Sequence, residues 1–335
     1  MRVLLVKTSS MGDVIHALPA LTDALARFPD LKVDWVVEEG FAEIPGWHPA
    51  VDRVIPVSIR RWRKQWLKSF FSGEIKAFRA ELTRERYDRV IDAQGLLKSA
   101  WITRQARGLT CGMDRNSARE PVASHFYKKS FPVARQQHAV ERIRQLFAQA
   151  LEYPVPTEVG AFGVQREQFL PEVVTEDKPY VVFLHGTTRD DKHWPEPYWQ
   201  TLCGMMAHRG YQIRLPWGNE RERQRAEAIA RITPAATVLP RLSLAEIATQ
   251  LVGASGAVAV DTGLGHLAAA LAVPTVSLYG PTSPDLIGAY GAHQRHLRAT
   301  DYTEIPQNGS GKAVDPAIFA PLHPALVKTA LLDLM

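Results

Sequence analysis

The chain has almost no cysteine and no long apolar run. Cys111 and Cys203 are its only cysteines, and neither has neighbours at metal-ligand spacing, which argues against a disulfide framework and against cysteine chemistry. The apolar run after Arg2 ends at Lys7, and no other run approaches the roughly 18 residues that cross a bilayer. We therefore expect a cytoplasmic globular protein without a membrane-spanning helix.

Several ligand-binding motifs are missing as well. The sequence contains neither GxGxxG nor GxxxxGK[ST], so dinucleotide-dependent hydride transfer and P-loop hydrolysis lose support. It also lacks HExxH, and only His185, His193 and His266 offer a conceivable cluster of metal ligands. We expect neither a metal ion nor another cofactor.

The composition is sufficient for two domains, and the two halves of the chain differ in net charge. The chain has 335 residues, of which 46% are hydrophobic and 22% charged, enough for two globular domains. Residues 1–150 hold 25 basic and 16 acidic side chains (25 − 16 = +9), whereas residues 151–335 hold 15 and 19 (15 − 19 = −4). The first half is therefore the better candidate for meeting a polyanion, which could be nucleic acid, acidic lipid or acidic sugar.

Short apolar runs alternate with helical periodicity along the chain. The run Arg2–Lys7 precedes a glycine turn and a helix, and further strands are expected at Val33–Val37, Val54–Val57 and Val90–Ile91. A stretch rich in Pro and Gly, Tyr153–Pro179, interrupts this pattern, which then resumes. Such alternation predicts an α/β protein with parallel sheets.

The interruption divides the chain into two doubly wound, Rossmann-like domains. We place the first at residues 1–160 and the second at residues 175–320. A last helical stretch within residues 321–335 is expected to pack back on the N-terminal domain.

Ligands of doubly wound sheets bind in the loops that follow the strands, and the first of these loops ends in a carboxylate. Thr8–Asp13 contains Gly12, which permits a sharp turn, and Asp13 lies where the helix begins. This residue is expected either to cap the helix or to face a ligand.

Two loops of the second half have the chemistry of a diphosphate site. Asp261–His266 contains two glycines, and a helix beginning at Gly263 would direct free N–H groups at a phosphate; a capped tight turn is the alternative. Thr187 and Thr188 offer hydroxyl groups, and Lys192 offers a cation that could balance a leaving diphosphate, unless the loop is merely solvated.

A basic segment, Ile59–Lys68, stands out in the first half. It contains five cations and no acid, and Ile59, Trp62 and Trp66 fall on one helical face. This pattern suits an anionic interface, although a solvated helix with both tryptophans in the core would have the same sequence. No recognised nucleic-acid module is visible, so nucleic acid is not the expected partner.

Six segments together resemble the lipopolysaccharide heptosyltransferases, which are GT-B glycosyltransferases. They are Met1–His16, Arg60–Lys64, Asp92–Leu96, Thr187–Trp194, Asp261–His266 and Tyr279–Thr282. The likeness covers nearly the whole chain. The second and fourth of these segments are similar to the enzyme type that adds the first heptose.

The resemblance implies an inverting, metal-independent transfer of L-glycero-D-manno-heptose from ADP-heptose to the first Kdo of Kdo2-lipid A. It implies peripheral contact with the cytoplasmic leaflet of the inner membrane, where this acceptor lies. Asp13 would be the catalytic base, and Lys192 would stabilise the departing ADP. The implied donor site consists of Thr187, Thr188, Lys192, Glu222, Asp261, Thr262, Gly263 and His266. The implied acceptor contacts are Arg60, Arg61, Arg63, Lys64 and Arg119.

Two rival functions remain open at this point. One is a heptosyltransferase that adds the second heptose rather than the first. The other is a two-domain sugar-binding protein without turnover.

Overall fold

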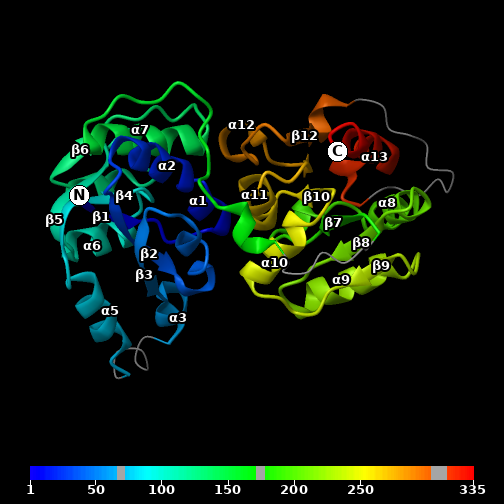
Figure 1. Ribbon diagram of the computed structural model, residues 1–335, viewed down its shortest axis with the longest axis horizontal. Helices are drawn as coiled ribbons and strands as arrows, with labels where there is room; N and C mark the ends of the chain where they lie inside the picture. The colour runs from blue at the N-terminus through cyan, green and yellow to red at the C-terminus, as the bar shows by residue number, and fades with distance from the viewer. Residues whose placement is uncertain (66–71, 171–177, 303–314) are drawn as a thin grey trace. The chain divides into compact units, whose positions relative to one another are not determined.

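Each half of the chain builds a six-stranded, entirely parallel sheet (Figure 1). The computed structural model describes residues 1–65, 72–170, 178–302 and 315–335. It divides into an N-terminal domain, Met1–Gln165, and a C-terminal domain, Arg166–Met335. The predicted α/β class with two Rossmann-like domains is confirmed.

The N-terminal sheet has the strand order β3-β2-β1-β4-β5-β6. Its strands are β1 (Arg2–Val6), β2 (Lys32–Glu38), β3 (Val51–Val57), β4 (Arg86–Asp92), β5 (Arg107–Met113) and β6 (Lys129–Phe131). Its helices are α1 (Met11–Ile15), α2 (Leu18–Arg27), α3 (Ile59–Lys64), α5 (Glu74–Leu82), α6 (Leu97–Gln105) and α7 (Ala139–Leu151).

Helices cover both faces of this sheet. Phe78 and Leu82 of α5 and Ile102 of α6 join one core layer with buried strand residues, while α7 packs on α2 and against β4, β5 and β6. Because β1 is buried on both faces, its sequence after Arg2 is continuously apolar rather than alternating.

The C-terminal sheet has the order β12-β11-β10-β7-β8-β9, which repeats the first pattern when its strands are counted in chain order. Its strands are β7 (Tyr180–Leu184), β8 (Gln212–Leu215), β9 (Ala236–Val238), β10 (Gly256–Val260), β11 (Thr275–Tyr279) and β12 (Gln294–Arg298). Its helices are α8 (Glu196–His208), α9 (Glu220–Ala230), α10 (Leu244–Val252), α11 (Gly263–Ala270), α12 (Pro284–Ile287) and α13 (Pro324–Leu332).

The last helix, α13, packs on its own domain. Val327, Ala330 and Leu331 lie in the core of the C-terminal domain, and the indole N–H of Trp194 donates to Leu322 O at 2.9 Å. This differs from the expected packing on the N-terminal domain, because the apolar face of α13 is used to cover β10, β11 and α8.

The strand order reverses direction at one place in each sheet, between β1 and β4 and between β7 and β10. Val6 pairs with Asp92 at the end of β4, and Leu184 pairs with Ala259 near the end of β10. In doubly wound sheets the loops that leave such a switch point bind the ligand. The loops containing Asp13, Lys192 and Asp261 leave these strands.

Candidate active site

Asp13 lies in the first turn of α1 and caps it. Its Oδ2 accepts hydrogen bonds from the Ser10 main-chain N–H at 2.8 Å and from the Ser10 hydroxyl at 2.9 Å. Its Oδ1 is 3.5 Å from the ammonium nitrogen of Lys7. The side chain is still 30% exposed, so the carboxylate caps the helix and remains open to a second molecule.

The surroundings of Asp13 keep it ionised. Burial raises its pKa, but the Lys7 ammonium, the two Ser10 hydrogen bonds and the Arg119 charge lower it by more, so the pKa lies below the usual value for aspartate. The carboxylate is therefore charged at neutral pH and able to accept a proton. Arg119 is exposed and acts on Asp13 through its charge.

The four basic residues predicted at α3 are all exposed, but their charges are not equally available. Arg61 pairs with Glu39 at 3.2 Å and with Glu74 at 2.8 Å. Both acids lie outside the basic segment, which is why the local sequence gave no sign of them. Arg60 lies with its guanidinium 5.9 Å from the ring of Phe41, and Arg63 and Lys64 complete the exposed cations of α3.

The apolar face of α3 is partly in the core. Trp62 packs edge-on against Phe78 with ring centroids 5.6 Å apart, and its indole N–H donates to Glu74 at 2.9 Å. A partly buried tryptophan and surface cations therefore occur in the same helix, so for Trp62 the two alternatives are compatible. Trp66 and Lys68 lie outside the described residues.

In the C-terminal domain Lys192 is held by Asp261. The Lys192 Nζ lies 2.5 Å from Asp261 Oδ2, and the two side chains are only 15% and 9% exposed. Thr282 also donates to Asp261 Oδ2 at 2.8 Å, and the Thr187 hydroxyl donates to Asp261 O at 3.0 Å. The loops after β7, β10 and β11 thus converge on one carboxylate, which fixes the direction of the ammonium group.

Helix α11 begins beside this ion pair. Thr262 is its N-cap residue and Gly263 its first residue, as predicted, and His266 is buried in its first turns. The N–H groups of a first helical turn have no acceptor within their own helix, and the helix dipole adds positive potential there. A helix end and an ammonium group therefore both lie close to Asp261.

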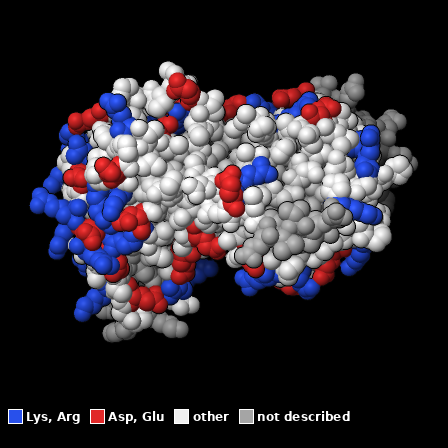
Figure 2. Space-filling view, viewed as in Figure 1, with Lys and Arg blue, Asp and Glu red and all other residues white. Residues whose placement is uncertain are grey.

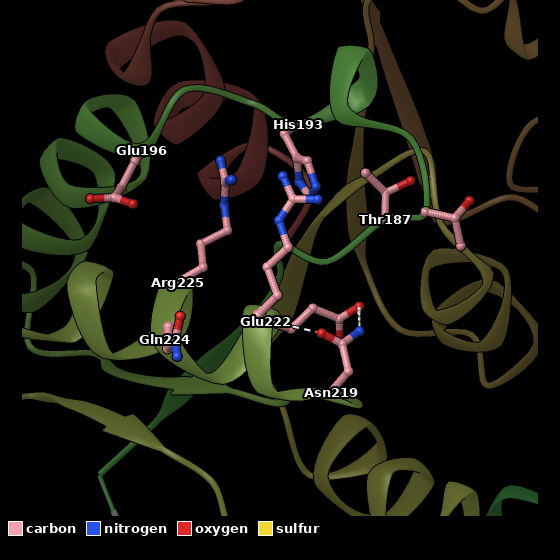
Figure 3. A pocket seen from close by; sticks show the side chains of 9 residues that line it. Thr187, His193, Glu196, Asn219, Glu222, Gln224 and Arg225 are labelled. Atoms are coloured by element: carbon pink, nitrogen blue, oxygen red, sulfur yellow. Dashed lines mark hydrogen bonds between the residues drawn. The ribbon is translucent and has the colours of Figure 1, made fainter.

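A cavity of about 470 Å³ lies in the C-terminal domain (Figure 3). Its lining consists of Thr187, Thr188, His193, Glu196, Asn219, Arg221, Glu222, Gln224 and Arg225. Glu222 is fixed there, because the Gly218 N–H donates to its Oε2 at 2.7 Å and the Asn219 amide to its Oε1 at 2.8 Å. A Cβ atom at Gly186 would come within 2.8 Å of Glu222 Cδ, so glycine at that position makes room for the carboxylate.

The structure brings the donor-site candidates together in two groups. Thr187, Thr188 and Glu222 line the cavity. Lys192, Asp261, Thr262 and Gly263 form the ion pair and the start of α11. His266 follows in that helix, where it is buried.

Sequence reasoning missed several polar residues of these sites. Thr282, which orients Asp261, occurs in the segment Tyr279–Thr282, but a hydroxyl without charge gave no reason to assign it a role. Arg225 and His193 line the cavity with Glu222 (Figure 3). Arg225 falls in a helix dense in Glu and Arg, where position alone does not distinguish a ligand-facing side chain from a solvated one.

His185 lies in the interior of the C-terminal domain. It is fully buried, and burial, assisted by the charges of Arg225 and His193, lowers its pKa to about 3, so the ring is neutral. Within the described ranges no three His, Cys, Asp or Glu side chains are grouped to hold a metal ion. Nor does any helix of those ranges have the length and apolar character to cross a membrane.

Two Rossmann-like domains with polar groups at both switch points define a class of protein. Two such domains are the architecture of a GT-B glycosyltransferase. The model of glycosyltransferase family 9 (heptosyltransferase) matches residues 75–317. The chain belongs to this family.

Individual relatives agree with the family. Lipopolysaccharide heptosyltransferase 1 of Pseudomonas aeruginosa is 56% identical over 347 residues, covering 99% of this chain and 97% of that protein. Lipopolysaccharide heptosyltransferase 2 of Escherichia coli K12 is 24% identical over 324 residues, covering 91% and 90%. The chain is thus much more similar to the first type than to the second.

Solved structures give the same result. E. coli heptosyltransferase WaaC with ADP has a TM-score of 0.91 at 50% identity and covers 100% of both chains. WaaC with ADP-2-deoxy-2-fluoro heptose has a TM-score of 0.88 at 50% identity and covers 99% of both chains. An enzyme is therefore favoured over the sugar-binding protein without turnover.

Proposed function

We propose that this glycosyltransferase transfers L-glycero-D-manno-heptose from ADP-heptose to the first Kdo of Kdo2-lipid A, with inversion and without a metal ion. The observation that carries the proposal is an ionised, accessible carboxylate, Asp13, at the switch point of the N-terminal sheet. The much higher identity to heptosyltransferase 1 than to heptosyltransferase 2 supports the first heptose as the one transferred.

Incubation with two acceptors separates the proposal from its rival. Purified protein with ADP-heptose is expected to add one heptose mass to Kdo2-lipid A and none to the monoheptosylated product. Transfer only to the latter would assign the second heptose, and ADP release without sugar transfer would contradict both.

Asp13 and Lys192 would act on different parts of the reaction, the attacking hydroxyl and the departing ADP. Asp13 removes the proton of the attacking Kdo hydroxyl, which needs a charged carboxylate within hydrogen-bond distance. Lys192, the hydroxyls of Thr187 and Thr188 and the N–H groups at Thr262 and Gly263 stabilise the negative charge that develops on the departing ADP. Glu222 would bind the ribose hydroxyls. This assignment places the acceptor on the N-terminal domain and the donor on the C-terminal domain.

Arg60, Arg63, Lys64 and Arg119 would bind the carboxylates and phosphates of the acceptor. Reversing the charge of Arg60 and Arg63 to Glu is expected to raise the acceptor KM about tenfold or more and to leave the donor KM unchanged, because charge-assisted hydrogen bonds are lost. Steady-state kinetics with each substrate varied would measure this.

A matched control lies at the amino-terminal ends of two inner strands of the same sheet. Arg86 and Arg107 are exposed at the starts of β4 and β5, and reversing both changes the net charge equally. An equal effect from that pair would show a general charge effect and contradict a local acceptor site. Arg61 is expected to contribute less than Arg60, since Glu39 and Glu74 already compensate its charge.

We also propose that the protein works at the cytoplasmic face of the inner membrane, through α6 and the short 3-10 helix η3 (Pro121–Phe126). Leu97, Trp101 and Val122 are 43%, 53% and 55% exposed. The two helices lie side by side, because the Leu97 N–H donates to Glu120 at 2.6 Å and the Arg104 guanidinium lies 5.9 Å from the Phe126 ring. We call Leu97, Trp101 and Val122 the apolar patch.

The charge around the apolar patch fits an anionic bilayer. Lysine and arginine side chains, with fewer aspartate and glutamate side chains among them, gather at the end of the N-terminal domain where β5 and α6 lie (Figure 2), and the segment 1–150 has a net charge of +9 (25 − 16). Exposed tryptophan and leucine beside cations are typical of helices that bind at the interface of a bilayer.

Co-sedimentation with lipid vesicles tests this surface. Replacing Leu97 and Trp101 by Ser is expected to weaken binding to vesicles of phosphatidylethanolamine and phosphatidylglycerol about tenfold, since these apolar side chains no longer enter the lipid. Ile232, 56% exposed in the C-terminal domain, supplies the matched control Ile232→Ser. Equal loss from the control, or no loss from the Leu97 and Trp101 variant, would contradict the proposed surface.

A further inference from the structure

The segment Asp92–Leu96 has no role in the assignment above, yet it is built around a buried carboxylate. Asp92 is fully buried at the end of β4. Its Oδ1 accepts from the main-chain N–H groups of Gln94 at 2.8 Å and Gly95 at 3.0 Å, and its Oδ2 accepts from the Tyr127 hydroxyl at 2.8 Å. The turn Ala93–Gly95 is therefore fixed from within the domain.

The turn Ala93–Gly95 also holds the loop that leads from β1 to Asp13. Gln94 is 7% exposed, and its Oε1 accepts from the N–H groups of Thr8 at 3.1 Å and Ser9 at 3.3 Å. Ala93 O accepts from the Lys7 ammonium at 3.0 Å. The same ammonium is the one that faces Asp13.

The third residue of the turn fixes the segment that contains Arg119. Gly95 has a φ of +66°, and a Cβ atom there would lie 3.3 Å from Arg119 N. Its carbonyl oxygen accepts from the Glu120 N–H at 2.9 Å. The turn thus contacts both segments that supply the groups around Asp13: the loop that contains Lys7 and Ser10, and the segment that contains Arg119.

We propose that Gln94 is a positioning residue for the base, and that the turn Ala93–Gly95, held by Asp92, fixes the Asp13 carboxylate and its cationic partners in their reactive arrangement. The inference rests on the proposed role of Asp13 as base. Gln94 touches no substrate in this account. It acts by holding the N–H groups of Thr8 and Ser9, so that the following Ser10 N–H and hydroxyl point at Asp13.

The charges that face Asp13 determine how its pKa should change when Gln94 no longer holds the loop. Lys7 at the end of β1 and Arg119 after β5 are the cations, and Ser10 supplies two hydrogen bonds; each of these lowers the pKa of Asp13, whereas burial raises it. When the loop is released, these contacts weaken and the pKa rises. The acidic limb of the kcat profile should then move to higher pH.

The main test is Gln94→Leu, which keeps the volume of the side chain and removes the acceptor. We expect kcat to fall about 10–100-fold, because misplacement of a reacting group by about 1 Å has that effect. The donor KM should stay within about twofold, since the donor is assigned to the other domain. Gln94→Glu, which keeps an oxygen acceptor, should retain most of kcat and serves as the second variant if Gln94→Leu unfolds.

A double-mutant cycle separates positioning from general damage. If Gln94 acts only through Asp13, Gln94→Leu has no further effect on kcat in the Asp13→Asn background. The matched control is Gln149→Leu in α7. This substitution removes the 3.0 Å hydrogen bond that the Gln149 amide donates to Pro132 O, and it should leave kcat and its pH profile unchanged.

The outcomes distinguish the two proposals. Normal kcat for Gln94→Leu, or the same loss with and without Asp13, would overturn the positioning role while leaving Asp13 as base. Near-normal kcat for Asp13→Asn would overturn the base role, and the role of Gln94 with it. Loss of kcat with a raised acidic limb, present only when Asp13 is intact, supports the inference.

Discussion

Replacing Asp13 by Asn is expected to lower kcat by about 10²–10⁴-fold, the usual contribution of a positioned general base. Asparagine has the same shape and can still accept a hydrogen bond from Ser10, so α1 should keep its cap. It cannot take up the proton of the acceptor hydroxyl. The binding of ADP, measured by titration calorimetry, should be nearly unchanged, because Asp13 lies in the N-terminal domain and the donor candidates lie in the C-terminal domain.

The pH dependence provides a second measurement on this residue. Because the pKa of Asp13 lies below the usual value of about 3.9, the wild-type base is charged throughout the range above that pH, and its activity falls only when the pH drops below it. Asp52→Asn is the matched control, since Asp52 is 41% exposed and pairs with Arg2 at the amino-terminal ends of β3 and β1, whereas Asp13 follows the carboxyl end of β1. Near-normal turnover of Asp13→Asn would remove this residue from the role of base.

Replacing Lys192 by Ala is expected to lower kcat by about 10²–10³-fold, as the loss of one preorganised donor to developing negative charge commonly does. The donor KM should rise as well, because the ammonium group is assigned to the diphosphate in both the ground state and the transition state. Initial rates with ADP-heptose varied at saturating acceptor would measure both effects.

Two further variants keep the Lys192 result interpretable. Removing the lysine leaves Asp261, 9% exposed, without its cation, which can destabilise the domain by itself. The double variant with Asp261→Asn relieves that cost, and the loss of kcat should persist in it. Lys328→Ala in α13 is the matched lysine control. An unchanged kcat and donor KM in the Lys192 variants would leave Lys192 as the ion-pair partner of Asp261, without a role in the reaction.

The fold could be predicted largely because the central strands are buried on both faces. Such strands must be almost entirely apolar, so β1, β7 and β10 are visible as short apolar runs between helical stretches. Outer strands lack this constraint. β12 has the sequence Gln-Arg-His-Leu-Arg, and only its pairing with β11 makes it a strand. The packing of α13 was not predictable for a related reason, since an apolar helix face does not specify which domain it covers.

The candidate site was predictable where one residue type has one plausible chemistry. A carboxylate after a glycine turn and glycines at the start of a helix are informative on their own, and Asp13, Asp261 and Gly263 were found in this way. Residues that interact with these groups from distant parts of the sequence were not predicted. Glu39 and Glu74, which compensate Arg61, and Gln94, which holds Thr8 and Ser9, are polar residues whose roles depend on what lies opposite them.

The sequence by itself determined the α/β class, the two domains, the charge difference between them and the chemical groups at the loop ends, because these follow from local patterns of apolar and polar residues. Only the tertiary structure decided which of those groups meet. The parallel pairing of β1 with β4 and of β7 with β10 brings together loops more than 60 residues apart in the chain, and the ionisation of Asp13 and the direction of Lys192 depend on those distant neighbours. Electrostatic and hydrogen-bond energies depend on distances of a few ångströms, and the order of residues does not specify them.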